Sequence, residues 1–237
     1  NNLKSIAFCC ISTGEFRFPN DLAAKIAVTE VKKFLKENPD ADLKVVFNVF
    51  KDLDKKLYED ILQEHRRVYE SLDEKDLYRF IDTVKKHDRI FLIGVGREGM
   101  ATRAFAMRLM HMGKEIHWIW DDTTPSINKG DLLIATLGDG EIGHIRYICQ
   151  KAKENGGYIY MITGSKSGSA VKELADDVLF VPASVYRGRD KVVESIQPMG
   201  NLFEQTLFIV LDMAVMMIVD SCDLTFEDMS KRHRNVE

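Results

Sequence analysis

Between residues 89 and 181, short apolar segments alternate with longer amphipathic ones, and this alternation limits the folds open to the chain more than any other feature. The longer segments carry apolar residues at the spacing of one helix face, which predicts helices at residues 100–112, 142–155 and 168–175. Strands are predicted for the apolar runs at residues 89–95, 115–120, 131–136, 157–163 and 177–181. Alternation of this kind forms a parallel sheet covered on both faces. The sequence therefore predicts an α/β fold with a doubly wound, five-stranded parallel sheet.

A smaller α/β pattern precedes this one. Its predicted order is a strand at residues 5–11, a helix at 20–36, a strand at 44–50 and a helix at 53–69. Ser71-Leu72-Asp73-Glu74 then resembles an N-cap with a capping box, so a second unit begins near this point. We therefore divide the chain into a small N-terminal segment, residues 1–69, and a larger domain, residues 70–237.

The composition narrows the classes of partner. Of the 237 residues, 45% are hydrophobic and 30% are charged, as in a folded protein with a sizeable core. The formal net charge is -4 and the two signs are interleaved, so the sequence has no basic patch for nucleic acid or a membrane surface. The longest apolar stretch, residues 206–220, is interrupted by Asp212 and is too short to span a bilayer, which favours a buried helix. The expected partners are small molecules and copies of the same chain.

The cysteines indicate a reducing compartment. Cys9, Cys10, Cys149 and Cys222 show neither the spacing of metal ligands nor a CxxC pair. Reduced thiols are typical of cytoplasmic proteins, and we therefore expect a cytoplasmic location.

A glycine-rich string, Gly94-Val95-Gly96-Arg97-Glu98-Gly99, follows an apolar strand and opens a helix. Backbone N–H groups and the helix dipole at such a position favour an anion. Asp121 and Asp122 end the next strand about twenty residues later, the spacing of a Rossmann dinucleotide site. The string alone leaves three interpretations open: an anion or sugar site, NAD binding, or a turn with a purely structural role.

Three ordered strings resemble those of the sugar isomerase (SIS) domains, and in particular the 6-phospho-3-hexuloisomerases. The first continues from the glycine string into Phe105-Ala106-Met107-Arg108-Leu109-Met110-His111-Met112-Gly113. The second is Glu194-Ser195-Ile196-Gln197-Pro198-Met199-Gly200-Asn201-Leu202-Phe203-Glu204-Gln205, and the third is Arg232-His233-Arg234-Asn235-Val236-Glu237. Together they cover most of residues 72–237.

The resemblance implies an aldose-ketose type of isomerase chemistry. Members of this family interconvert a 3-keto and a 2-keto hexose 6-phosphate through an enediol, without a metal or an organic cofactor. It implies that Glu204 is the base and that His233 moves a proton or opens the sugar ring, in a neighbouring subunit's site. The alternatives are a helix N-terminal carboxylate for Glu204 and a solvated tail residue for His233. The implied substrate contacts are Gly94, Gly96, Arg97, Glu98, Gly99, Gly138, Asp139, Gly140, Glu141 and Gln197.

The sequence departs from the family where the sugar phosphate is held. The family's first-loop serine is replaced by Glu98, and its Ser-Gly-Ser-Gly-Glu-Thr stretch reads Leu137-Gly138-Asp139-Gly140-Glu141-Ile142. Two like charges 4 Å apart repel by about 4 kcal/mol at an effective dielectric near 20, so these acids oppose a phosphate dianion. We expect a pocket that accepts another sugar derivative, carrying hydroxyls or an amine, or one that has lost catalysis. The alternative is that both acids point to solvent or pair with Arg97 and Arg103.

Three functions therefore stay open. The first is a sugar-phosphate ketose isomerase or a descendant with altered phosphate-loop specificity. The second is a non-catalytic module that binds or senses a sugar derivative, and the third is a Rossmann-type NAD-binding domain. The resemblance also implies a dimer or tetramer, because SIS sites form between subunits. The apolar helix offers large side chains for such contacts: Phe203, Leu207, Phe208, Leu211, Met213, Val215, Met216 and Met217.

The N-terminal segment resembles the C-terminal half of a macro domain over residues 3–66. In that family the loop corresponding to Ser12-Thr13-Gly14 cradles the diphosphate of ADP-ribose, whereas Glu15 and Arg17 here replace small or apolar residues. The family's first half, with its ligand loop, is not present in this sequence. A half sheet has an open strand edge and an incomplete cleft, so we do not expect this chain alone to bind ADP-ribose.

Overall fold

The computed structural model describes residues 4–9, 20–39, 41, 43–48, 52–188 and 190–236. These residues form two compact units, Asn1–Asp60 and Ile61–Glu237. Helix α2 (Asp52–Ser71) begins in the first unit and ends in the second. The Ser-Thr-Gly loop of the macro-like segment, with Glu15 and Arg17, lies outside the described residues.

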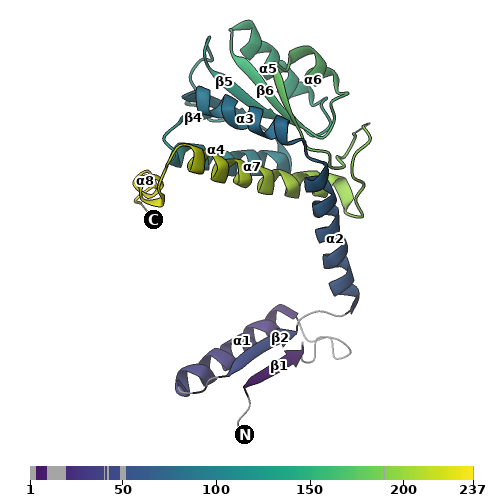
Figure 1. The fold of residues 1–237 in the computed structure, drawn as a ribbon, viewed down its shortest axis with the longest axis vertical. Coiled ribbons are helices and arrows are strands. Elements are labelled where there is room, and N and C mark those ends of the chain that lie inside the picture. Colours follow the sequence, from purple (N-terminus) through teal and green to yellow (C-terminus); the bar gives the residue numbers. More distant parts are fainter. Residues whose placement is uncertain are drawn as a thin grey trace. The chain divides into compact units, whose positions relative to one another are not determined.

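The first unit is a small parallel α/β element (Figure 1). Strand β1 (Ser5–Cys9) pairs in parallel with β2 (Lys44–Asn48), and α1 (Asn20–Glu37) connects them. Apolar side chains stay exposed in this unit: Ile26 and Phe34 are each 49% accessible. The sequence-based expectation of a small α/β segment with few strands is therefore confirmed.

The second unit contains the predicted five-stranded parallel sheet. Its strand order is β4-β3-β5-β6-β7, and neighbouring strands are parallel. The apolar runs of the sequence form these strands because both of their faces are covered. The strands are β3 (Arg89–Ile93), β4 (Glu115–Trp118), β5 (Leu132–Thr136), β6 (Tyr158–Thr163) and β7 (Asp177–Phe180).

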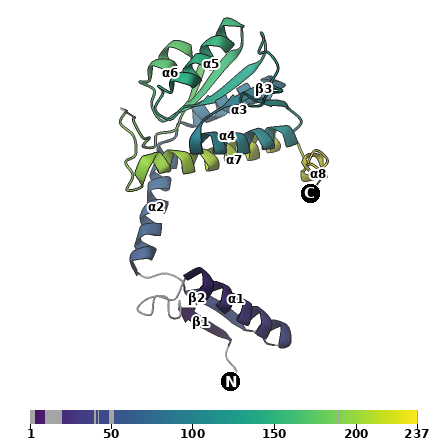
Figure 2. The same cartoon turned by 180° about the vertical axis from the view of Figure 1, so that it is seen from behind.

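Helices cover both faces of this sheet (Figures 1 and 2). Alternate residues of one strand point to opposite faces, so Tyr160 and Ile162 of β6 join one core cluster whereas Ile159 and Met161 join the other. The second cluster includes residues of α5 (Gly143–Glu154) and α6 (Ser169–Leu174). The first includes residues of α3 (Glu74–Lys86), α4 (Gly96–His111) and α7 (Asn201–Ser221).

The apolar helix α7 is half buried. Leu207 and Leu211 of this helix lie in the core against α4, whereas Phe208 and Met216 are 42% and 72% accessible. Among the described residues, the stretch Pro198–Ser221 alone is long and apolar enough to cross a membrane, and 50% of its apolar window is buried inside the protein. Because it packs on α4, its apolar composition is that of a core helix.

Three local details differ from the sequence-based predictions. The N-cap of α3 is Asp73 rather than Ser71, because its Oδ1 accepts a hydrogen bond of 2.9 Å from the Lys75 N–H. Helix α4 begins at Gly96 rather than residue 100, so most of the glycine string lies in its first turn. A short helix that the sequence did not predict, α8 (Phe226–Ser230), follows α7 and is capped by Thr225.

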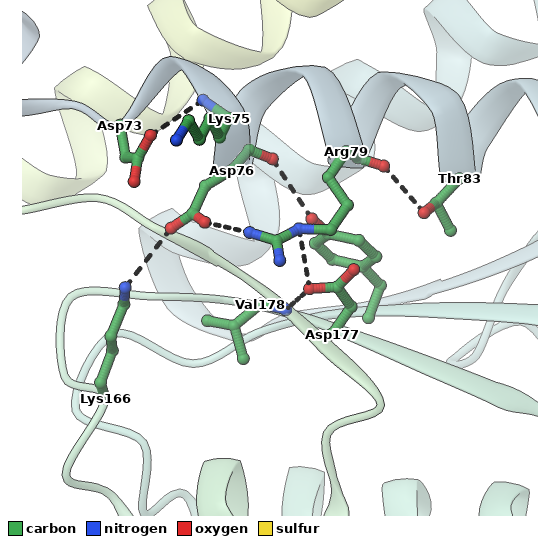
Figure 3. A network of polar contacts seen from close by, with 9 residues as sticks. Asp73, Lys75, Asp76, Arg79, Thr83, Lys166, Asp177 and Val178 are labelled. Carbon is green, nitrogen blue, oxygen red and sulfur yellow. Dashed lines mark hydrogen bonds and ion pairs between the residues drawn. The ribbon is translucent and has the colours of Figure 1, made fainter.

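A polar network joins the start of α3 to the sheet (Figure 3). Asp76 is ion-paired with Arg79, and the Arg79 Nε lies 3.3 Å from Oδ1 of Asp177 at the start of β7. The buried Tyr160 hydroxyl donates to the Asp76 carbonyl over 3.4 Å. Lys166, from the loop after β6, reaches Asp76 Oδ2 at 3.4 Å. The network therefore directs the Lys166 side chain towards Asp76.

Candidate functional site

The site lies where the sheet reverses its winding. Strands β3 and β5 are neighbours, yet α4 and α5, which follow them, pack on opposite faces of the sheet. The carboxyl ends of two such strands leave a crevice between the loops that follow them, and ligands of open α/β sheets bind there. The first glycine loop, residues 94–99, follows β3, and the second glycine loop, residues 137–142, follows β5.

Glycines let the backbones of these loops approach their neighbours. A Cβ on Gly94 would lie 2.3 Å from Thr136 Oγ1, and a Cβ on Gly99 would lie 2.7 Å from the Gly94 oxygen. Gly140 has a φ of +72° and packs against Gly168 so closely that a Cβ on Gly168 would lie 2.5 Å from Gly140 Cα. The predicted turns of both glycine loops are therefore present.

Glu204, the residue expected to act as base, lies in the first turn of α7 with a side chain that is 15% exposed. The guanidinium of Arg97, in the first turn of α4, forms an ion pair with it. Helices α4 and α7 pack against each other, and this packing brings the two residues together across 107 positions of sequence. The structure thus joins two of the predicted site residues in one contact.

Glu98 turns inward to the second glycine loop. Its Oε2 accepts a hydrogen bond of 2.9 Å from the Gly138 N–H. A Cβ on Gly138 would lie 2.5 Å from Glu98 Oε1, so the carboxylate lies directly on the loop backbone. Burial raises the pKa of Glu98 to about 7, against the effect of the Gly138 hydrogen bond, and the charges of Asp139 and Glu204 raise it further.

The sequence left open that Glu98 and Asp139 pair with Arg97 and Arg103, and this pairing is not observed for Glu98. Arg97 pairs with Glu204, and Arg103 lies 3.4 Å from Asp121, so neither pairs with Glu98. Asp139 Oδ1 accepts the Glu141 N–H at 2.9 Å within its own loop. The Glu98 carboxylate therefore binds the backbone of the second glycine loop from outside, whereas Asp139 makes a hydrogen bond within that loop.

A hollow of about 670 Å³ borders the second glycine loop on the side of α5 and α6, and Asp139, Glu141, Ser165, Ser167 and Arg187 are among the residues that line it. Two carboxylates, Glu141 and Asp190, make hydrogen bonds to the backbone around it. Glu141 accepts the Ser169 N–H at 2.9 Å and the Ser169 hydroxyl at 2.7 Å, which caps the start of α6. Asp190 accepts the Ser167 N–H at 3.0 Å.

The hydroxyls and the lysine near the strand ends are engaged in other contacts. Thr136 Oγ1 lies 2.7 Å from Thr102 Oγ1, behind the loops, and Ser165 Oγ lies 3.2 Å from Ser167 Oγ. Lys166 points to Asp76 (Figure 3), and its Nζ lies over the Phe180 ring at 4.7 Å from the centroid. Thr136 and Lys166 therefore do not replace the phosphate-binding hydroxyls of the second glycine loop, whereas Ser165 and Ser167 line the hollow beside it.

Gln197 is held by a residue that the sequence analysis did not single out. Glu64, near the end of α2, accepts hydrogen bonds from the Ser195 hydroxyl at 2.6 Å and from Gln197 Nε2 at 3.1 Å. Next to it, His65 Nε2 lies 2.9 Å from Oε1 of Gln205, the neighbour of Glu204. The signal in the sequence was a pair of polar residues on the apolar face of α2, one turn before the buried Val68.

His233 lies away from Glu204 within one chain. Its ring stacks on His111 with centroids 5.2 Å apart, at the last residue of α4. Arg97 and Glu98 lie in the first turn of the same 16-residue helix, and a helix of that length spans about 24 Å at 1.5 Å per residue. The structure therefore does not bring His233 and Glu204 into one site of a single chain.

Of the residues expected for a dinucleotide site, only those of the glycine string line a separate hollow. A cavity of about 330 Å³ lies on the outer side of the first glycine loop, lined in part by Gly96, Arg103, Trp118 and Trp120. Asp121 pairs with Arg103 beside it. Within the part of the chain that the structure describes, no group of three or more His, Cys, Asp or Glu side chains is arranged to hold a metal ion.

Comparison with known proteins places the second unit. The SIS domain model matches residues 83–185. The 3-hexulose-6-phosphate isomerase of Bacillus subtilis is 35% identical over 169 residues, which cover 71% of this chain and 90% of the relative. A crystal structure from Methanococcus jannaschii, described as inferring a function of 3-hexulose-6-phosphate isomerase, has a TM-score of 0.65 and 31% identity, and the match covers 76% of this chain and 98% of that one.

The first unit has different relatives. The Macro domain model matches residues 1–27. A protein-ADP-ribose hydrolase of Staphylococcus aureus is 56% identical over 62 residues, which are 26% of this chain and 23% of the relative. The matched segment thus spans about a quarter of that protein.

Proposed function

The chain belongs to the SIS-domain family of sugar-phosphate isomerases, and we propose that it moves a carbonyl group between C3 and C2 of a ketose through an enediol, with Glu204 as the base. The observation that carries the proposal is the Arg97–Glu204 ion pair at the carboxyl edge of the sheet. It keeps a mostly buried carboxylate at the crevice where this fold binds ligands.

Proton transfer within a ketose needs one base and a donor for the developing oxyanion. In the proposed reaction, the Glu204 carboxylate takes the proton from C2 of the 3-keto sugar, and the C2–H electron pair forms the C2=C3 bond of the enediolate. Glu204, after its proton has exchanged in part with solvent, delivers a proton to C3, while the hydroxyl proton of the C2 oxygen moves to the C3 oxygen and the C2 oxygen becomes the new carbonyl. Arg97 supports this step because its guanidinium orients the carboxylate and lies beside the developing negative charge.

His233 enters the proposal as a group supplied by a second copy of the chain. Within one chain it stacks on His111 at the far end of α4 from Glu204. A role in ring opening or proton transfer at Glu204 therefore requires an assembly in which the C-terminal segment of one subunit reaches the crevice of another. His233→Ala tests this role, and mixing it with Glu204→Gln should restore part of the activity, because a mixed assembly combines one intact copy of each residue.

The decisive experiment is solvent deuterium incorporation. In D₂O the full chain should place deuterium at C2 or C3 of a ketohexose substrate, and NMR measures this incorporation. Glu204→Gln should lower the rate of incorporation by at least about 10²-fold. Glu154→Gln removes one carboxylate at the end of α5, away from the crevice, and serves as the matched control. Exchange that persists unchanged in Glu204→Gln would exclude Glu204 as the base.

A second candidate function, a non-catalytic sugar-binding module, is favoured by one observation. The Glu98 carboxylate lies on the Gly138 N–H, where a phosphate-binding member of the family would need a free donor. Such a module would bind a sugar without exchanging its carbon-bound protons. The deuterium experiment separates the two functions, since binding by calorimetry without deuterium incorporation would support the module. The NAD hypothesis predicts instead a calorimetric signal with the dinucleotide.

A further inference from the structure

The backbone donors around the second glycine loop are satisfied by carboxylates of the chain itself. Glu98 accepts the Gly138 N–H at 2.9 Å, and Asp139 accepts the Glu141 N–H at 2.9 Å. Across the hollow, Glu141 accepts the Ser169 N–H at 2.9 Å and Asp190 accepts the Ser167 N–H at 3.0 Å. A sugar phosphate needs such donors free, because N–H groups at loop and helix starts are what hold an anion.

The charged residues that line the hollow also disfavour a phosphate group. Among its lining residues in the described part of the chain, the carboxylates are Asp139 and Glu141, and Arg187 is the one cation. Arg187 is exposed and lies over the Tyr186 ring, 5.1 Å from the centroid. One exposed cation does not offset two carboxylates for an arriving dianion, since each like charge at 4 Å adds repulsion of about 4 kcal/mol at an effective dielectric of 20.

Glu98 differs from the other carboxylates because it reaches the loop from α4, across the crevice. Its position is fixed by the Gly138 backbone, because the Gly138 N–H donates to Oε2 and a Cβ on Gly138 would lie 2.5 Å from Oε1. Burial raises its pKa to about 7, so near neutral pH its carboxyl group carries less charge than an exposed glutamate and both accepts and donates hydrogen bonds. Sugar hydroxyls and amines match a group of this kind, whereas a phosphate oxygen competes with it for the Gly138 N–H.

We propose that Glu98 sets the ligand specificity of the second glycine loop through its contact with the Gly138 N–H, excluding a phosphate group there and favouring a sugar derivative that presents hydroxyl or amine donors. The inference rests on the proposed function, because it names the substrate class of the same site. It specifies which group of the sugar binds residues 137–142, and it leaves the role of Glu204 unchanged.

Calorimetric titration of the full chain with four probes tests the inference: inorganic phosphate, D-fructose 6-phosphate, D-fructose and D-glucosamine. The wild-type chain should bind D-fructose or D-glucosamine at least tenfold more tightly than D-fructose 6-phosphate. Glu98→Ser removes the carboxylate and frees the Gly138 N–H, so its affinity for both phosphate probes should rise at least tenfold. Glu98→Gln keeps an acceptor for Gly138 without the charge and should give a smaller rise.

Glu154→Gln is the control, because it removes an exposed carboxylate of α5 without touching the hollow, and its affinities should equal those of the wild type. The inference is overturned if the wild type binds D-fructose 6-phosphate as tightly as the unphosphorylated probes do, or if neither Glu98 variant gains phosphate affinity. Thermal unfolding of each variant verifies that it is folded. Deuterium incorporation is measured separately. If the chain shows no isomerase activity but its Glu98→Ser variant gains phosphate affinity, the proposed function is refuted and this inference stands.

Discussion

Oε1 of Glu64 lies 2.6 Å from the backbone nitrogen of Ile196, so a carboxylate in the second half of α2 holds residues 195–197, which lead into α7. Glu64 is 2% exposed and accepts two further hydrogen bonds, from Ser195 and Gln197. The segment that carries Gln197 therefore depends on a residue more than 130 positions earlier in the chain. This contact also makes the end of α2 a structural part of the second unit.

Replacing Glu64 with alanine should lower the free energy of unfolding by about 3 kcal/mol. The variant leaves three part-buried hydrogen bonds without an acceptor, and each such loss costs about 1 kcal/mol. Chemical denaturation of the full chain measures the change. Glu70→Ala is the matched control on the same helix, because Glu70 forms an exposed pair with Arg66 and its loss should cost only a few tenths of a kcal/mol. Equal losses in the two variants would contradict the structural role of Glu64.

The pKa of Glu64 predicts how this contribution depends on pH. Burial alone would raise the pKa, but the hydrogen bonds from Ser195, Ile196 and Gln197 outweigh it and hold the pKa below the usual value of 4.5. Since the folded pKa is depressed, the stabilisation is present above the unfolded pKa and is lost as the pH falls through the folded one. The difference in stability between the wild type and Glu64→Gln should therefore be constant from pH 6 to 8 and shrink below about pH 4.5.

Glu98 should produce the opposite dependence on pH. Its folded pKa is raised to about 7, mainly by burial, with Asp139 and Glu204 adding to the rise. The folded state therefore binds a proton more tightly than the unfolded state, and stability is lost as the pH rises from about 4.5 to 7. Glu98→Gln cannot ionise, so its stability relative to the wild type should increase across this window by on the order of 2–3 kcal/mol. Parallel stability curves for the two proteins would show that Glu98 ionises as an exposed carboxyl does.

Cys149 should be protected from thiol reagents in the folded protein. It lies on α5 with no exposed surface, and burial raises the pKa of its thiol to about 12. Reaction with a disulfide reagent needs a thiolate and access, and both are withheld here. Cys149→Ala should leave the rapidly reacting thiols unchanged at pH 8, because Cys9 and Cys222 are exposed. A rapid phase that disappears in this variant would mean that α5 opens readily.

The residue pattern predicted the sheet and its covering helices because strand and helix periods are local properties of the chain. Alternation of apolar runs predicted all five strands, and the apolar stretch predicted α7 within a few residues. The start of α4 was predicted too late because Gly96 and Gly99 are poor helix formers, although Gly99 fits where the helix meets β3. Helix α8 was missed because it has five residues and a mixed sequence.

The arrangement of the site could be predicted only in part. The resemblance named Glu204 and Arg97, but their ion pair follows from the packing of α4 on α7. The replacement of a phosphate-loop serine by Glu98 was visible in the sequence, whereas its hydrogen bond to Gly138 depends on two loops 40 positions apart meeting at the reversal of the sheet. Glu64 lay in a segment whose sequence resembles another family, so its role in the second unit had no local signal strong enough to single it out.

The exposed face of α7 predicts self-association of the full chain. Ile209 and Met216 are 50% and 72% accessible, and Met216 borders a groove of about 760 Å³. The groove is lined by Met213, Met216, Met217, Val219 and Leu224, with Asp220 and Asp223 also in its lining. A charge placed there would be buried without a partner in an assembly that covers this face, which costs at least 1.4 kcal/mol or tenfold in affinity. Met216→Glu should therefore shift the chain towards monomer by at least tenfold in sedimentation equilibrium, whereas Leu62→Glu, at a 66% exposed position of α2, should not. If Met216→Glu leaves the association constant unchanged, the subunits meet through another surface, and the C-terminal segment with His233 must reach a neighbouring crevice by a different route.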